Sequence, residues 1–282
     1  MGHKQLTNMP YANRSVLHTN LHTDSMPNVY ELAEYTDSLL ETATISDYSG
    51  ALNGLQLENR SEIRGVVAAV DFSTRAINGA IATKANLLVV HHGMFWDAPA
   101  PIQGSSYKRL RLLIENDIAV YSSHLPLDRH PTLGNNILLA KHLGLKPTAA
   151  FAGFQGVSIG VSGESQIETA VLAEQARKFA RTCGSEVRTT LIEGNRQTKR
   201  WGICTGAGAS AETLKEAREL KIDTLIVGEG PHWTAVYAEE NEIAIIYAGH
   251  YATETLGVRA LAEHLGAKFG IPSSFVSAPT GL

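Results

Sequence analysis

Short apolar segments of strand length alternate with longer amphipathic segments along most of the chain. Runs of mainly aliphatic residues occupy 65–70, 86–90, 118–122, 224–227 and 243–247. Their length and composition are typical of buried strands. Helical spacing of apolar residues first occurs over residues 29–40, which predicts the first helix. Strands that alternate with helices indicate an α/β fold.

The same spacing predicts most of the other elements. We expect helices over 73–84, 106–116, 135–142, 168–181, 210–220, 233–240 and 252–265, and further strands at 151–163, 186–190 and 201–205. The strand–helix–strand unit between residues 65 and 90 is typical of two parallel strands joined by a right-handed crossover. Ser73 is a suitable N-cap for the helix in this unit.

The charge balance restricts the partners that we expect. The 282 residues include 24 Lys and Arg against 28 Asp and Glu, which gives a formal net charge of −4. A chain without excess positive charge lacks the electrostatic attraction that nucleic acid and anionic membrane surfaces require. We therefore expect neither of these as a partner.

Cysteine content and hydropathy predict a cytoplasmic protein. The two cysteines, Cys183 and Cys204, lie far apart and outside any Cys-x-x-Cys motif. This argues against disulfides and a thiolate zinc site, and it fits a reducing compartment. No apolar run approaches the ~20 residues of a membrane span. Residues 1–27 are polar and lack the basic-then-apolar order of a signal peptide, so we expect them to form a disordered extension.

Histidine and carboxylate side chains gather just after three of the predicted strands. His91 and His92 follow the strand that ends at residue 90, and Asp128 follows the strand 118–122. His250 and Glu254 follow the strand that ends at residue 247. Proteins of the α/β class place their sites at the carboxyl ends of strands. Three imidazoles and two carboxylates without a thiolate suit Zn, Fe, Mn, Co or Ni rather than Ca.

Local geometry permits these side chains to meet, but each part also has a purely structural interpretation. Neighbouring strand residues point to opposite faces, yet Gly93 allows the chain to turn after the histidine pair. His250 and Glu254 are four residues apart and share one face of a helix. A surface His-His pair, an exposed His-x-x-x-Glu pair and a turn aspartate are common alternatives. The spacing of these residues alone does not decide between a metal site and these structural alternatives.

Several neighbours of these residues have two interpretations. His124 lies four residues before Asp128 and is the candidate catalytic residue, because a histidine there can act as a general acid or base. A structural histidine is the alternative. We expect Asp71 to cap the helix that follows it, although it can also face the site. We expect His130 to hold its own loop.

Other polar and aromatic residues also lie near the predicted strand ends. Glu229 and His232 follow the strand 224–227, and we expect both to be surface residues. The run Gly-Ala-Gly-Ala-Ser at 206–210 follows a strand and opens a helix, so its amides can hold an anion. It lacks the glycine pattern of a dinucleotide site and the lysine of a phosphate loop. Phe95 is expected to pack, whereas Trp96 can either stack on a base or form a cavity wall.

Four sequence blocks resemble one protein family and occur in that family's order. They are NGLQLE at 53–58, VVHHGMFW at 89–96, SSHLPLDRHPTLGNN at 122–136, and a closing block from IVGEGPHW at 226–233 through AGHYATETLGVRALAEHLG at 248–266. From about residue 29 to residue 277 the chain is similar to the Nif-three-like family (NGG-interacting factor three). Members of this family are also called GTP cyclohydrolase I type 2 homologues.

The resemblance implies both a site and an assembly. The ligands of a dinuclear metal centre in the family correspond to His91, His92, Asp128, His250 and Glu254. The implied fold has two interlinked α/β domains. In this chain the first would consist of residues 28–125 together with 255–282, and the second of residues 126–254. The implied assembly is a toroidal homohexamer. Larger members carry an inserted domain, for which 143–201 is too short, so the chain resembles the compact form.

A metal-dependent hydrolase is the leading functional hypothesis. Two close metal ions lower the pKa of a bridging water and hold the attacking and leaving oxygens. The family name suggests a nucleotide or pterin-like small molecule as the substrate. The alternative is a non-catalytic metal-binding or metal-handling scaffold that acts through protein partners. Five protein ligands shared by two ions leave open coordination positions, which favours catalysis.

Overall fold

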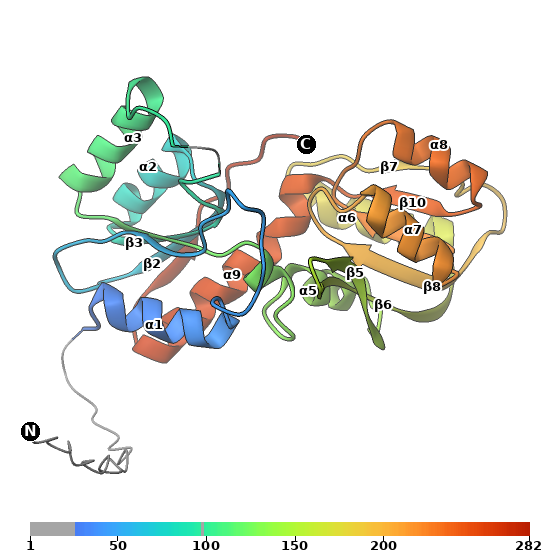
Figure 1. The fold of residues 1–282 in the computed structure, drawn as a ribbon, viewed down its shortest axis with the longest axis horizontal. Coiled ribbons are helices and arrows are strands. Elements are labelled where there is room, and N and C mark those ends of the chain that lie inside the picture. The colour runs from blue at the N-terminus through green and yellow to red at the C-terminus, as the bar shows by residue number, and fades with distance from the viewer. Residues whose placement is uncertain (1–25, 97–98) are drawn as a thin grey trace, which may run out of the picture.

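The computed structural model describes residues 26–96 and 99–282 (Figure 1). The extension predicted over residues 1–27 lies outside the described residues, apart from its last two. The described chain forms a mixed α/β fold with two sheets, which confirms the predicted fold class. Figure 1 shows the elements up to β4 on one side, the strands from β5 to β10 on the other, and helix α9 between them.

The first sheet is mostly parallel and has helices on both faces. Its strand order is β1-β4-β3-β2-β11, with β1 (Gly54–Leu57) antiparallel to β4 (Ala119–Ser122) and the other pairs parallel. The remaining strands are β2 (Val66–Asp71), β3 (Leu87–His92) and β11 (Ser273–Phe275). The helices that accompany it are α1 (Val29–Leu40), α2 (Thr74–Thr83) and α3 (Gly104–Glu115).

Alternate residues of this sheet enter two different cores. Val66 and Ala68 pack in the cluster that contains residues of α1 and α9, whereas Val67 and Ala69 pack in the cluster that contains residues of α2 and α3. Because both faces of the sheet are covered at its centre, β2 and β3 are continuous aliphatic runs over most of their length, without polar alternation.

The second sheet has the strand order β5-β6-β8-β9-β10-β7. Strands β8 (Gln197–Cys204), β9 (Thr224–Val227) and β10 (Ala244–Tyr247) are parallel. Strands β5 (Ala149–Phe154), β6 (Val157–Glu168) and β7 (Arg188–Thr189) pair antiparallel. Helices α6 (Thr169–Thr182), α7 (Ala211–Glu219) and α8 (Trp233–Glu240) accompany this sheet. Its parallel strands also bury both faces, in two separate cores.

Helix α9 (His250–Phe269) contributes to the cores of both sheets. Val258, Leu261 and Leu265 pack in the core shared with α1, while Ala252 packs in the core of the second sheet that includes Trp201. The short helices α4 (Leu125–Asp128) and α5 (Asn135–His142) join the two halves. The predicted domain division at residues 254 and 255 falls inside α9, and the division of the chain into domains stays a prediction.

Most predicted elements agree with the structure, but β1, α4 and β11 were not predicted. Strands β2 and β3 are parallel and joined by α2, and Ser73 Oγ accepts the amide of Ala76 at 3.2 Å as the N-cap of α2. The single strand predicted at 151–163 is instead a hairpin of β5 and β6. Gln155 and Gly156, both with positive φ, form its turn. The last helix begins at His250, two residues before the predicted start.

The sequence predicts that no segment spans a membrane, and the helices of the structure can be compared with this prediction. Within 26–96 and 99–282, no helix is both long and apolar enough to cross a bilayer.

Candidate metal centre

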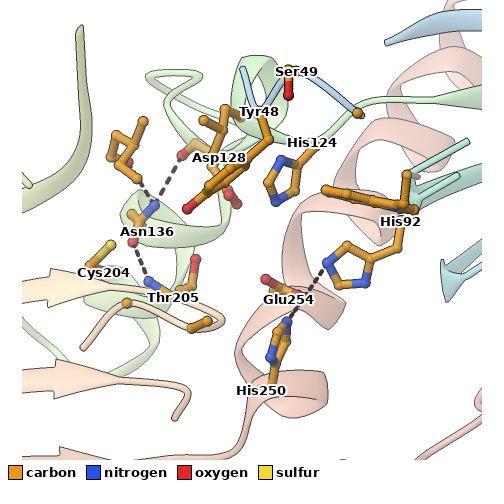
Figure 2. A pocket seen from close by; sticks show the side chains of 16 residues that line it. Tyr48, Ser49, His92, His124, Asp128, Asn136, Cys204, Thr205, His250 and Glu254 are labelled. Carbon is orange, nitrogen blue, oxygen red and sulfur yellow. Dashed lines mark hydrogen bonds and ion pairs between the residues drawn. The ribbon is translucent and has the colours of Figure 1, made fainter. Parts of the chain in front are cut away.

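Five predicted ligands from three parts of the fold meet in one cavity. His91 and His92 are the last residues of β3, Asp128 is the last residue of α4, and α9 begins at His250. Figure 2 shows His92, Asp128, His250 and Glu254 around the same space. His91 is fully buried, and Glu254 and Asp128 are 2% and 6% exposed. The structure thus brings together all five residues predicted from the strand ends.

The distances divide these side chains into two groups that share Glu254. His91 Nε2 lies 3.5 Å from Asp128 Oδ2 and 3.5 Å from Glu254 Oε1. The other carboxylate oxygen, Glu254 Oε2, lies 3.3 Å from His92 Nε2 and 3.2 Å from His250 Nε2. Two ligand atoms that each lie about 2.1 Å from one ion are about 3.0–3.4 Å apart. Each group therefore has the spacing of ligands around one metal ion.

Two buried atoms in these groups have no hydrogen-bond partner. Among the described residues, neither His91 Nε2 nor Glu254 Oε2 makes a hydrogen bond. Buried polar atoms in proteins are nearly always paired. A metal ion would supply the missing partner, because an imidazole nitrogen and a carboxylate oxygen both bind it through a lone pair. The residues present therefore fit a metal ion.

The second nitrogen of each histidine ligand is fixed from outside the cavity. The Nδ1 partners are Ser123 O for His91 at 2.9 Å, Asp71 Oδ1 for His92 at 2.8 Å, and Glu229 Oε1 for His250 at 2.8 Å. Because each acceptor is an oxygen, Nδ1 carries a proton, and Nε2 is the nitrogen whose lone pair is available to a metal ion in the neutral ring. Such outer partners orient histidine ligands and make them more basic.

These bonds correct two predictions. Asp71 does not cap α2, which Ser73 caps, because its carboxylate accepts from His92 instead. Glu229, expected to be a surface residue, is about half exposed but bonds His250. Both residues are within a few positions of the predicted strand ends, so sequence order had placed them close to the site without showing which way they point. His232 is exposed, as predicted.

Asn135 holds the carboxylate of Asp128, a role that sequence reasoning missed. Its Nδ2 donates to Asp128 Oδ1 at 2.8 Å, and its Oδ1 accepts the amide of Gly257 in α9 at 2.6 Å. Asp128 Oδ2 is then left to face His91. Asn135 is fully buried. The Gly-Asn-Asn run at 134–136, where α5 begins, was the available signal, since two adjacent asparagines are unusual at a buried helix start.

His124 faces the same centre from the loop before α4. Its Nδ1 bonds Asp47 Oδ1 at 2.8 Å, and its backbone amide donates to Asn53 Oδ1 at 2.7 Å. Asn53 Nδ2 donates in turn to Asp47 Oδ2 at 2.8 Å. The His124 ring centroid lies 4.8 Å from that of His91. Sequence reasoning missed Asp47, because its segment has only the composition of a turn.

The electrostatics of the cluster favour a cation. Burial by itself lowers the pKa of His91, but the carboxylates of Asp128 and Glu254 outweigh it and raise that pKa well above its usual value. Burial likewise lowers the pKa of His250, but Glu254 and Glu229 raise it to about 9. Burial raises the pKa of Glu254, yet the neighbouring histidines hold it well below its usual range. The buried carboxylates therefore stabilise positive charge at this place.

The cluster opens into a cavity of about 690 Å³ that is also lined by Tyr48, Trp96, Ile159 and Thr205. The Trp96 ring centroid lies 4.8 Å from that of His124 and 5.5 Å from that of His92, so Trp96 forms a cavity wall.

Two further predictions concern residues near the cavity. Phe95, which was expected to pack, is 46% exposed. The prediction for His130 is confirmed, because its Nδ1 accepts the amide of Leu133 at 3.0 Å within its own loop.

Replacement of Asp71 by asparagine is expected to weaken metal binding without removing a ligand. The amide lacks the charge that makes His92 more basic, and loss of such an outer partner typically lowers metal affinity about 10–100-fold. Competition with a coloured chelator measures this change. Asp37→Asn is the matched control, since Asp37 bonds Tyr121 and none of the five candidate ligands. Equal affinity in Asp71→Asn and wild type would refute the role assigned to Asp71.

Comparisons with known proteins agree with the sequence blocks described above. The chain is 38% identical over 252 residues to the GTP cyclohydrolase 1 type 2 homolog of Deinococcus radiodurans, which covers 89% of this chain and 94% of that protein. Among solved structures, the protein ybgI, described as of unknown function, is 32% identical with a TM-score of 0.81, covering 90% of this chain and all of that one. TTHA1606 from Thermus thermophilus is 33% identical with a TM-score of 0.77, again over 90% of this chain and all of that one.

These relatives match over nearly their whole length, so they share the compact form without an inserted domain. The sequence model for DUF34/NIF3 (NGG1p interacting factor 3) matches residues 27–278, which covers all the described elements. The chain therefore belongs to the DUF34/NIF3 family.

Proposed function

We propose that the chain binds two divalent metal ions and hydrolyses a small molecule in the adjoining cavity. The observation that carries this proposal is the position of Glu254, whose two oxygens face different groups of ligands. His91 and Asp128 lie beside Oε1, and His92 and His250 lie beside Oε2. One carboxylate bridging two ions fits this arrangement.

The ligand chemistry suits Zn, Fe, Mn, Co or Ni. When bound, a pair of such ions acidifies water and holds the attacking and leaving oxygens of a hydrolysis. The chain itself supplies the other functions. His124, fixed by Asp47, holds or moves a proton at Nε2 beside the bound molecule. Trp96 and Tyr48 exclude water from part of the cavity and offer flat surfaces to a ring. The name of the similar proteins, GTP cyclohydrolase 1 type 2 homolog, supports a nucleotide or pterin-like substrate.

Metal analysis and a hydrolase screen of the same samples test this proposal. We expect about two ions per wild-type chain after metal loading. His92→Ala should lose one ion and the activity, while His232→Ala, a change at an exposed histidine, should retain both. Two ions without hydrolysis of any nucleotide, pterin or related ester would favour the metal-handling scaffold. Fewer than about half an ion in the loaded wild type would refute the metal centre.

We also propose that the chain assembles into a toroidal homohexamer in the cytoplasm. Family membership supports the hexamer, and so do large apolar side chains exposed on the single chain, among them Tyr107, Ile114, Trp233 and Val236. Both cysteines are free and buried, which fits a reducing compartment. Light scattering after size-exclusion chromatography measures the assembly, and a mass of one chain would contradict the hexamer.

A further inference from the structure

We infer that Thr205 and the loop after it form a binding subsite for an oxyanion, such as the phosphate or carboxylate group of a small molecule, beside the metal centre. This inference rests on the proposed function, because the two ions supply the opposing charge. The loop connects β8, which ends at Cys204, to α7, which begins at Ala211. Thr205, Ala207 and Gly208 of this loop line the cavity.

The Thr205 hydroxyl is the first observation that calls for a ligand. Thr205 is only 6% exposed, and its Oγ1 makes no hydrogen bond to any described residue. A buried hydroxyl without a partner is destabilising, and at a cavity wall a bound ligand can supply that partner. Figure 2 shows the Thr205 side chain directed into the cavity, beside Asn136 and across from Glu254. The Thr205 amide donates to Asn136 Oδ1 at 2.9 Å, which fixes the position of the residue.

Two backbone amides of the loop are the second observation. The amides of Gly206 and Ala209 are used, since they donate to Thr253 Oγ1 at 3.0 Å and to Glu229 O at 3.3 Å. Within the described part of the chain, the amides of Ala207 and Gly208 donate to no acceptor. These free N–H groups stand just before the N-terminus of the nine-residue helix α7, where a helix favours negative charge.

The backbone of the loop at Gly208 packs closely against the end of β8. A Cβ on Gly208 would lie 1.9 Å from the backbone oxygen of Cys204, so only glycine permits this fold of the loop against the end of β8. The unused groups are one hydroxyl and two N–H donors, which together match the acceptor oxygens of a phosphate or carboxylate.

The charge at the site selects an anion only when metal is bound. No Lys or Arg is among the described residues that line the cavity. Among the five candidate ligands, Asp128 and Glu254 contribute two negative charges, and two divalent ions would contribute four positive ones, so the ligands and ions together would carry about +2. The subsite therefore places a substrate oxyanion next to the ions with donors of its own, and the ions provide the neutralising charge. A ligand held at both places is fixed in orientation for attack.

Calorimetric titration of the metal-loaded protein with inorganic phosphate, and separately with acetate, tests the inference. Thr205→Val removes the hydroxyl at constant shape and is expected to weaken phosphate binding about 10-fold or more, because a hydrogen bond to a charged group is lost. Thr205→Ser keeps the hydroxyl and should stay within about 3-fold of wild type. Metal content of every sample should be unchanged. Tighter binding of phosphate than of acetate identifies a phosphate-bearing ligand, and the reverse order a carboxylate.

The outcomes separate the subsite from the metal centre. Equal phosphate and acetate affinities in wild type and Thr205→Val, with metal content intact, would mean that the anions bind the ions alone and would overturn the subsite. Failure of the wild type to hold metal would contradict the proposed function. The subsite would then be overturned together with the proposed function, because without the ions the carboxylates of Asp128 and Glu254 leave the site negative.

Discussion

Glu254→Gln is expected to abolish the tight binding of both metal ions. Glu254 is the one carboxylate that faces both groups of ligands, with Oε1 beside His91 and Oε2 beside His92 and His250. Glutamine keeps the shape of the side chain but loses the negative charge, and each ion then has only two protein ligands left. By contrast, Asp128→Asn or His250→Ala removes a ligand from one group and should cost one ion.

Elemental analysis after dialysis measures the effect, with an expected decrease from about two ions per chain to below about half an ion. Glu263→Gln is the matched control, because Glu263 is an exposed carboxylate on the same helix. Circular dichroism of Glu254→Gln confirms that the fold is retained. Two ions retained by a folded Glu254→Gln protein would show that Glu254 does not bridge the centre.

Gly206→Ala is expected to remove at least one ion although residue 206 is not a ligand. A Cβ at this position would lie 2.1 Å from Glu254 Oε1, so the carboxylate has to move away from His91 and Asp128. Gly206 also has a φ of +62°, and a left-handed conformation costs a residue with a Cβ roughly 1–2 kcal/mol. Metal content and denaturant unfolding of the metal-free protein measure the two effects separately.

Gly270→Ala isolates the backbone cost of such a change. Gly270 ends α9 with a φ of +67°, and a Cβ there would have no atom within 4 Å. We therefore expect the two alanine variants to lose similar free energies of unfolding, while only Gly206→Ala loses metal. If Gly206→Ala binds both ions with wild-type affinity, the contact between this loop and Glu254 is not as close as the structure places it.

The sequence allowed the fold class and the five candidate ligands to be predicted, because both depend on local patterns. Aliphatic runs of strand length define β2, β3, β9 and β10, and α/β proteins place their sites where such strands end. The end of β10 belongs to the second sheet and the ends of β3 and β4 to the first, so their meeting was not encoded locally and was implied by the resemblance to a family. The strand end alone left His91 and His92 open between a site and a surface pair, and the resemblance to a family decided for the site. The hydrogen-bond partners of the candidate ligands were harder to predict from the sequence.

Those partners depend on contacts between residues far apart in the chain. Asp47 meets His124 across 77 residues, and Asn135 meets Gly257 across 122. No local spacing encodes such pairs, so Asp47 and Asn135 were missed. Asp71 illustrates a second limit, because an aspartate just before a helix has a satisfactory local role as a cap. Only the position of His92 on the neighbouring strand shows that the carboxylate is used elsewhere.

We expect helix α9 to make the unfolding of the two halves cooperative. Its apolar residues belong to the cores of both sheets, so neither half can unfold without exposing part of a surface that the other half needs covered. Its first turn carries His250 and Glu254, whose partners come from β3 and α4. On the proposed function, ions that bind only this assembled arrangement would add their binding free energy to the stability of the whole chain, by the linkage between ligand concentration and unfolding. Metal supply and resistance to unfolding would then be joined in one helix.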